Sequence, residues 1–205
     1  MTQPTTVVFD LGGVLIDWDP RYAYRQMGGT DAEIEHFLEH VAVSEWNRQF
    51  DGGRPFAEGI AERKKEFPEH AEWLDAWWSR WPDMLGGAID GTVQILRELR
   101  DAGTPIYALT NWSAETFPIA QERFDFLSWF RGVVVSGEVR KTKPDEDIFE
   151  HLADDFGIEP EGAVFIDDSL PNVETARRLG FHGIHFTDPD DLRQRLAALG
   201  FPIGT

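Results

Sequence analysis

The sequence predicts an α/β fold in which a doubly wound parallel sheet is interrupted by a long helical insert. In the C-terminal half, short apolar runs alternate with stretches of helical periodicity, which is typical of βαβ units with right-handed crossovers. One more apolar run stands near the N-terminus, and only helical patterns separate it from that half. A chain of 205 residues suits one core domain that carries a smaller insert.

The first elements place the insert directly after a strand. Residues 6–9 predict a buried strand that ends at Asp10 and feeds a tight glycine turn. Asp19 and Pro20 indicate a helix start, with Asp19 as the N-cap and Pro20 at the first helical position. No strand pattern follows until about residue 85, and apolar spacing predicts helices at 32–43, 56–67 and 69–81. We therefore expect a core formed by 1–16 and 88–205 and an all-helical cap at 17–87.

The rest of the chain supplies the other strands of the sheet and the helices that connect them. Strands are predicted at 104–109, 132–135, 163–166 and 183–186, and helices at 91–101, 115–123, 145–156, 172–179 and 190–199.

Composition excludes several classes of protein. The 37 acidic residues outnumber the 19 Lys and Arg, which gives a net charge of −18 and argues against binding to nucleic acid or to an anionic membrane. The chain has no cysteine, so disulfides, thiolate catalysis and cysteine-ligated metals are excluded. With no signal-peptide pattern at residues 1–6 and no apolar run of about 20 residues, we expect a cytoplasmic protein. The oligomeric state stays open.

Chemically useful side chains gather at predicted strand ends and at one basic turn. Asp10 and Gly12-Gly13 follow the first strand, Thr110-Asn111 follows the next, and Asp167-Asp168 follows a later one. Ligands of open parallel sheets bind outside the carboxyl ends of the strands, so one shared site is expected there. Together with Lys143-Pro144, these groups suit phosphoryl transfer: a nucleophilic carboxylate, a hydroxyl, an ammonium and a pair of carboxylates.

These segments, in this order and with a helical insert after the first, resemble the haloacid dehalogenase superfamily. The resemblance covers nearly the whole chain and implies a Rossmann-like core with a cap of the type-one kind. It also implies phosphoryl transfer through an aspartate. The Asp-Leu-Gly start is similar to that of a subgroup of sugar-phosphate phosphatases.

The resemblance implies a role for each of these residues. Asp10 becomes the nucleophile, and Thr110 donates a hydrogen bond to a phosphoryl oxygen. Lys143 neutralises the phosphate and the attacking carboxylate, with Arg140 and Lys141 as alternatives for this role. Backbone amides near Asn111 and the glycine turn at Gly13 approach the phosphate, and Trp112 is positioned to stack on a sugar or hydrocarbon.

The same resemblance implies Mg²⁺ as the cofactor. The ion would be bound by Asp10, by the backbone carbonyl of Gly12 and by Asp168, with Asp167 and Asn172 supporting the site. Without a cation, two adjacent acids raise each other's pKa, which favours a metal beside Asp167-Asp168.

Gly12 departs from the superfamily pattern. Typical phosphatases of the superfamily carry there an aspartate that protonates the leaving group, a contribution worth about 10² to 10⁴ in rate. Without it, rates are expected to depend steeply on the acidity of the leaving group. Asp17 stands a few residues further on as one replacement.

The tryptophans of the insert have a simpler interpretation. Trp73, Trp77 and Trp81 recur every four residues, so we expect one helical stripe in the core of the cap. The six histidines show no spacing typical of metal ligands.

Three functions remain open from the sequence. The first is a Mg²⁺-dependent phosphatase acting on a small phosphorylated metabolite, with a sugar phosphate as one candidate. The second is a 2-haloacid dehalogenase that uses Asp10 without a metal, and the third is a non-catalytic binder of phosphorylated ligands. The acid pair at 167–168 favours the phosphatase, because it would repel a carboxylate substrate.

Overall fold

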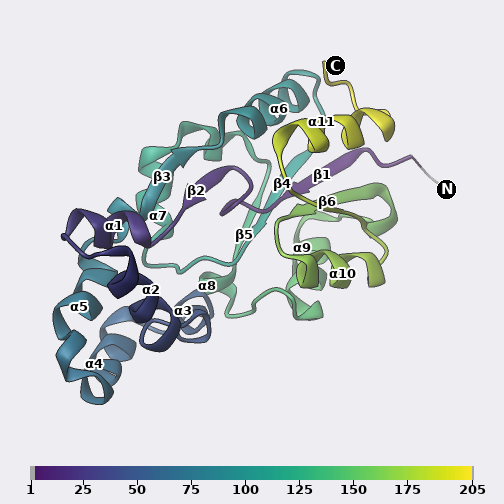
Figure 1. Ribbon diagram of the computed structural model, residues 1–205. Coiled ribbons are helices and arrows are strands. Elements are labelled where there is room, and N and C mark those ends of the chain that lie inside the picture. Colours follow the sequence, from purple (N-terminus) through teal and green to yellow (C-terminus); the bar gives the residue numbers. More distant parts are fainter. Residues whose placement is uncertain (1–2, 205) are drawn as a thin grey trace.

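A five-stranded parallel sheet forms the centre of the molecule (Figure 1). The computed structural model describes residues 3–204. The strand order is β5-β4-β1-β6-β7, and every neighbouring pair is parallel. The strands are β1 (Thr6–Phe9), β4 (Ile106–Thr110), β5 (Val133–Val135), β6 (Ala163–Asp167) and β7 (His182–His185). The predicted fold class is confirmed, and each strand of the sheet lies within two residues of its predicted bounds.

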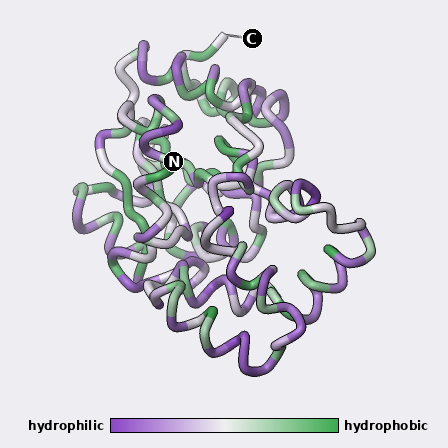
Figure 2. The backbone as a smooth tube through the Cα atoms, turned by 90° about the vertical axis from the view of Figure 1, so that its left-hand side faces the viewer, coloured by the Kyte–Doolittle hydropathy of each residue, from purple (hydrophilic) through white to green (hydrophobic). Residues whose placement is uncertain are grey.

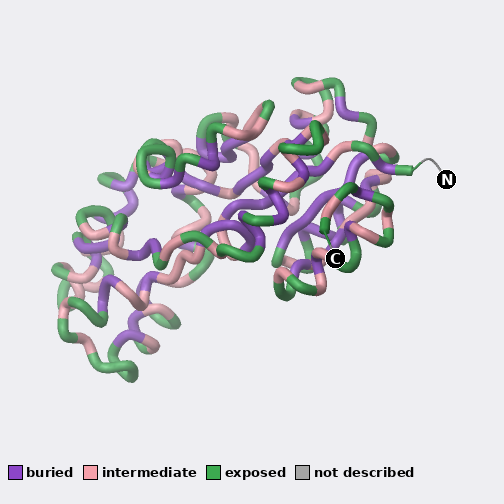
Figure 3. The backbone as a smooth tube through the Cα atoms, turned by 90° about the horizontal axis from the view of Figure 1, so that it is seen from above, coloured by how far each residue is buried: buried purple, intermediate pink, exposed green. Residues whose placement is uncertain are grey.

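Helices cover both faces of the sheet. In β1, Val7 and Phe9 face the core shared with α6 (Asp90–Asp101) and α11 (Pro189–Ala198), whereas Val8 faces α9 (Glu146–Phe156) and α10 (Leu170–Arg178). Figure 3 shows the sheet strands as buried segments between these layers. Because side chains alternate along a strand and both faces are buried, β1 is apolar throughout.

The connections place a topological switch at the middle of the sheet. After β1 the chain builds β4 and β5 on one side and then returns to build β6 and β7 on the other. The short elements α7 (Phe117–Arg123), η3 (Asp125–Trp129), α8 (Ser136–Val139) and η4 (Pro160–Gly162) complete this half. The carboxyl ends of β4, β1 and β6 therefore meet at the edge where ligands of such sheets bind.

The helical insert lies between the two strands of a small antiparallel pair, β2 (Ile16–Trp18) and β3 (Leu85–Ala88). Figure 1 shows its helices gathered at one end of the molecule. Figure 2 shows helical turns that alternate between hydrophilic and hydrophobic residues, as amphipathic helices do. The elements are α1 (Arg21–Gln26), α2 (Asp31–His40), α3 (Ser44–Asp51), α4 (Phe56–Glu66), η1 (Pro68–His70), α5 (Ala71–Ser79) and η2 (Trp81–Met84).

The all-helical prediction for 17–87 holds from Arg21 to Met84 but is wrong at its two ends, which lie in β2 and β3. β2 and β3 have only three and four residues, and β3 contains Gly86-Gly87, so neither carries a strand pattern that can be read alone. They are strands because they pair with each other. Helix α1 starts one residue later than predicted: Pro20 is its N-cap, and the Asp19 carboxylate accepts a hydrogen bond from the Arg21 amide at 2.9 Å.

Aromatic side chains fill the interior of the insert. The rings of Tyr24 and Trp73 stack 4.9 Å apart, and the Tyr24 hydroxyl donates to the Trp73 carbonyl at 2.9 Å. Trp77 is buried beside them, as the predicted stripe requires. Trp81 does not continue the stripe, because α5 ends at Ser79 and Trp81 begins η2.

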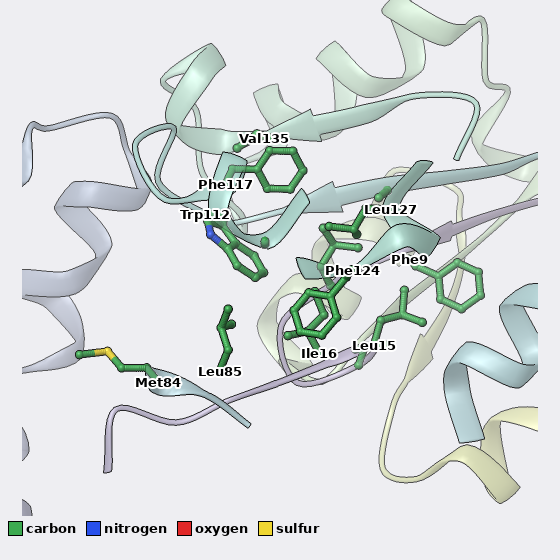
Figure 4. Close-up of a cluster of buried hydrophobic side chains, with 14 of the residues drawn as sticks. Phe9, Leu15, Ile16, Met84, Leu85, Trp112, Phe117, Phe124, Leu127 and Val135 are labelled. Atoms are coloured by element: carbon green, nitrogen blue, oxygen red, sulfur yellow. The ribbon is translucent and has the colours of Figure 1, made fainter. Parts of the chain in front are cut away.

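A hydrophobic cluster joins the antiparallel pair to the sheet (Figure 4). Ile16 of β2 and Leu85 of β3 are buried in the same core as Phe9 of β1 and Trp112, which follows β4. The two strands that lead into and out of the insert are thus fixed beside the carboxyl edge of the sheet. Within the described part of the chain, no helix is both long enough and apolar enough to span a bilayer.

Candidate active site

A buried ammonium group holds two strand-end carboxylates together. Asp10 directly follows β1, Asp167 ends β6, and Lys143 lies in the loop between α8 and α9. The Lys143 Nζ lies 2.9 Å from Asp10 Oδ2 and 2.6 Å from Asp167 Oδ2, and it donates to the Leu109 carbonyl at 2.9 Å. Its three N–H groups thus all have acceptors within the protein. Lys143 therefore affects a ligand mainly through the position and charge of Asp10, with which it is paired.

Asp167 is held rigidly below the surface. Its side chain is fully buried, and Asn172 Nδ2 donates to both carboxylate oxygens at 3.0 Å. The Ser169 amide donates to Oδ1 at 2.8 Å. With both oxygens already engaged, Asp167 supports its neighbours and is poorly placed to bind an ion directly.

The acids at this edge form a possible cation site. One carboxylate oxygen each from Asp10, Asp167 and Asp168 lies within 4.8 Å of the others. Asp168 is exposed toward the cavity described below, and Gly12 lines that cavity. Hard divalent cations prefer oxygen donors, and Mg²⁺ needs few of them from the protein because it keeps several waters. The donor set at Asp10, Gly12 and Asp168 therefore fits Mg²⁺, with Asp167 behind it.

Burial, together with the neighbouring charges, shifts the pKa values of the cluster. Burial raises the pKa of Asp10 to about 8, with Asp167 adding to the rise and Lys143 opposing it. Burial and the neighbouring Asp167 also raise the pKa of Asp168. Burial acts to lower the pKa of Lys143, but the charges of Asp10 and Asp167 outweigh it and the net shift is upward. A bound cation would favour the charged carboxylates.

The turn after Asp10 brings backbone close to the acids. Gly13 has a φ of +71°, and a Cβ built there would overlap the Asp168 carboxylate. Gly12 is different, because a Cβ there meets nothing within 4 Å. The Leu11 amide donates to Asp10 Oδ1 at 2.7 Å, which orients the carboxylate.

Thr110 and Asn111 occupy the end of the neighbouring strand β4. The Thr110 hydroxyl is buried and has no hydrogen-bond partner among residues 3–204, so its capacity to donate a hydrogen bond is unused. Asn111 instead fixes the lysine loop: its Nδ2 donates to the Lys143 carbonyl at 2.9 Å, and its Oδ1 accepts from the Lys143 amide at 2.8 Å. Asn111 lines the cavity, whereas Thr110 and Lys143 lie beneath it.

A cavity of about 260 Å³ opens above these residues, between the sheet edge and the helical insert. Its wall contains Asp10, Gly12, Gly13, Asn111, Trp112 and Asp168, which the sequence singled out. The other wall residues were missed: Trp18, Asn47, Asp51, Phe56, Trp81, Ser113 and Thr116. Trp112 is buried, and its indole N–H has no partner within residues 3–204.

The missed residues carry no motif of their own. Asn47 and Asp51 lie on α3, a helix that the sequence analysis did not predict, and Trp81 was expected in the core of the insert. The signal that could have found Asp51 is its place directly before Gly52-Gly53, a turn that lies close to Thr142 and Gly137 of the core.

Asp17 does not reach the cavity. It is not among the residues that line the cavity, although its neighbour Trp18 is, and a Cβ built at Gly86 would overlap its carboxylate. The Asp17 carboxylate instead accepts a hydrogen bond from the Tyr22 hydroxyl at 2.7 Å.

Comparison with known proteins identifies the family. Residues 4–180 match the haloacid dehalogenase-like hydrolases, and the chain belongs to this family. It is 27% identical to the sesquiterpene phosphatase astK of Aspergillus oryzae, over 88% of this chain and 89% of the relative. It is 25% identical to a phosphoglycolate phosphatase of Thiobacillus denitrificans, over 85% and 79% of the two chains.

A solved structure shows the same fold. The magnesium complex of the enzyme bt-2542 from Bacteroides thetaiotaomicron, a member of the same family, superposes with a TM-score of 0.74. The match covers 95% of this chain and 99% of that one at 20% identity.

Proposed function

We propose that this chain is a Mg²⁺-dependent phosphatase that hydrolyses a small phosphorylated metabolite through an aspartyl-phosphate on Asp10. The observation that carries the proposal is the buried cluster in which Lys143 bridges Asp10 and Asp167 beside the more exposed Asp168. Membership of a hydrolase family that includes phosphatase relatives supports it. The proposal includes a cytoplasmic location and a small phosphate ester as the partner.

Each residue of the cluster has a role in this reaction. Asp10 Oδ attacks phosphorus, the bond to the ester oxygen breaks, and water then releases phosphate from Asp10. Lys143 holds Asp10 in place and balances its charge, and Thr110 donates its unpartnered hydroxyl to a phosphoryl oxygen. The backbone turn at Gly13, the backbone amides near Asn111 and the indole of Trp112 contact the substrate.

Mg²⁺ would be held by Asp10, Asp168 and the Gly12 carbonyl, with Asp167 supporting them. When bound, it supplies positive charge that stabilises the phosphoryl oxygens. A positive charge is needed here because no Lys, Arg or His is among the residues that line the cavity in the described part of the chain.

The cavity favours a substrate that carries no charged group other than its phosphate. Its wall combines acids with the aromatic rings of Trp18, Phe56, Trp81 and Trp112, so a second anionic group on the substrate would meet no cation. A sugar or an apolar alcohol can stack on such rings. Residues 17–87 act as a cap that limits the size of the substrate, and a sugar phosphate remains one candidate.

The test is a panel of sugar phosphates, apolar alkyl phosphates, phosphoglycolate and 2-haloacids, assayed with Mg²⁺ and with EDTA. We expect phosphate release from the neutral-alcohol esters that is lost in EDTA and restored by Mg²⁺. The Asp168→Ala variant should reproduce the loss, and Asp167→Ala should be milder. Halide release in EDTA would instead support the dehalogenase. Tight binding of phosphate esters without turnover would support the non-catalytic binder.

A further inference from the structure

The geometry points to Asp51, on the helical insert, as the acid that protonates the leaving group and so replaces the aspartate absent at position 12. The inference rests on the proposed phosphatase function. The site has a nucleophile, Asp10, but no proton donor at position 12, because Gly12 has no side chain. A poor leaving group, such as the oxygen of an alkyl alcohol, needs that proton as its bond to phosphorus breaks.

Asp51 lies in the same cavity as Asp10 but comes from the opposite side. It is the last residue of α3 (Ser44–Asp51), whereas Asp10 and Asp168 belong to the sheet edge. In an in-line displacement the attacking and leaving oxygens lie on opposite sides of phosphorus. With Asp10 attacking from the sheet, the leaving oxygen faces the insert, which is the side that carries Asp51.

The helix end that carries Asp51 is bound to the catalytic edge through one buried serine. The Ser136 hydroxyl donates to the Asp51 carbonyl at 2.6 Å and accepts from the Trp112 amide at 2.9 Å. Gly53 adds a second contact: it has a φ of +89°, and a Cβ there would lie 2.8 Å from the Gly137 carbonyl. The position of Asp51 relative to the sheet is therefore set by backbone contacts that do not involve its side chain.

The surroundings of the Asp51 carboxyl leave one oxygen available. Asn47 Nδ2 donates to Asp51 Oδ2 at 3.2 Å, and Asn47 is itself held by the Trp77 indole, which donates to its Oδ1 at 3.2 Å. No other hydrogen bond to this carboxyl is found within residues 3–204. Asp51 lines the cavity and its Oδ1 has no partner in this part of the chain, so that oxygen is free to carry a proton.

The charged groups around Asp51 do not neutralise it. Arg48, one turn earlier on α3, directs its guanidinium to the Lys143 carbonyl at 3.4 Å and to Asp145 at 3.9 Å. Lys143 is committed to Asp10 and Asp167, and Asp168 and Asp10 are the other acids of the cavity. Burial raises the pKa of Asp51 to about 7, against the smaller opposing effects of Arg48 and Lys143. A protonated carboxyl is thus accessible near neutral pH.

The proton balance of the step is simple. Asp10 forms a bond to phosphorus while the bond from phosphorus to the ester oxygen breaks, and the Asp51 proton moves to that oxygen to give a neutral alcohol. The Asp51 carboxylate then takes the proton released when water attacks the aspartyl-phosphate. No oxidant or further co-reactant is needed.

Single-turnover rates of alcohol release across phosphate esters of graded leaving-group pKa test the inference, because they isolate the first step. For wild type we expect a shallow dependence, in place of the steep one that the sequence predicts from Gly12, because Asp51 supplies the proton. For Asp51→Asn, which keeps the shape and the Ser136 contact, release from alkyl esters should fall by about 10² to 10³. Release from an activated aryl ester should fall less than about tenfold, which also shows that the variant is folded. Asp51→Glu should recover part of the alkyl rate.

Asp17→Asn is the matched control, since Asp17 is an acid near the site that does not line the cavity and accepts from the Tyr22 hydroxyl. It should keep the wild-type slope. An Asp51→Asn slope equal to that of wild type, a uniform loss on all esters, or steepening in Asp17→Asn would each overturn the assignment to Asp51. In the first and third cases, with Mg²⁺-dependent hydrolysis by wild type intact, the proposed function would stand. Absence of hydrolysis by wild type would overturn both.

Discussion

The two glycines after Asp10 differ in what a methyl group would meet. At Gly13 the backbone has a φ of +71° and an added Cβ would overlap the Asp168 carboxylate, whereas at Gly12 the space is open. Both positions look alike in the sequence. Gly13 is needed for the conformation of the turn, and Gly12 contributes its carbonyl, which any residue can supply.

Gly13→Ala should therefore be more harmful than Gly12→Ala. We expect Gly13→Ala to lower the free energy of unfolding by more than about 1 kcal/mol and to weaken Mg²⁺ binding, because the Asp168 side chain must move. Gly12→Ala should change the free energy of unfolding by less than about 1 kcal/mol. Urea denaturation and Mg²⁺ titration of both variants measure this. Equal stability of the two variants would contradict the turn geometry.

Individual site residues differed in how well the sequence could predict them. The structure brings Asp10, Asn111, Lys143, Asp167 and Asp168 together, and apolar runs that end at one edge of a parallel sheet carry that information. Asp51 could not be found this way. It reaches the cavity only because α3 docks on the sheet edge, and docking between distant segments leaves no periodic pattern.

Among the helices and strands, too, some could be predicted from the sequence and others could not. The elements of the sheet half were predictable because their apolar faces are continuous and long enough to have a period. The pair β2 and β3 was not, since each strand is very short and exists through pairing across some 70 intervening residues. The bounds of the cap, residues 17 and 87, thus remain a prediction. Residue 17 lies in β2 and residue 87 lies in β3.

The contact between α3 and the sheet edge depends on Ser136. Replacing it with alanine leaves the Trp112 amide and the Asp51 carbonyl without their partner. Ser136→Ala should lower the free energy of unfolding by about 1–3 kcal/mol. It should also reduce kcat/KM for an alkyl phosphate, because Asp51 loses its fixed position. Urea denaturation and steady-state kinetics provide the two measurements.

Ser128→Ala is the control for this change. Ser128 makes the same kind of bond, from its hydroxyl to the Asp125 carbonyl at 2.7 Å, but it is exposed and lies away from the cavity. Its loss should cost less than about 0.5 kcal/mol. Similar losses in both variants would contradict a special role for Ser136.

The molecule as a whole is strongly negative, and the lysine at the candidate site is buried. With a net charge of −18, the chain repels anions at long range. The one ammonium of the cluster, on Lys143, is buried and shared between two carboxylates. A phosphate ester can then bind only if further positive charge is supplied at the sheet edge, and Mg²⁺ held by Asp10 and Asp168 would supply it.

Locating the phosphoryl group during turnover shows whether catalysis proceeds through Asp10. The enzyme is mixed with Mg²⁺ and excess phosphate ester, quenched within one turnover and treated with borohydride, which reduces an acyl phosphate to an alcohol. Peptide mass spectrometry then reads position 10. We predict reduction at Asp10 in wild type and, in Asp10→Asn, a folded protein without turnover. Phosphate release with an unmodified Asp10, or more than a few per cent of wild-type activity in Asp10→Asn, would contradict catalysis through an aspartyl-phosphate.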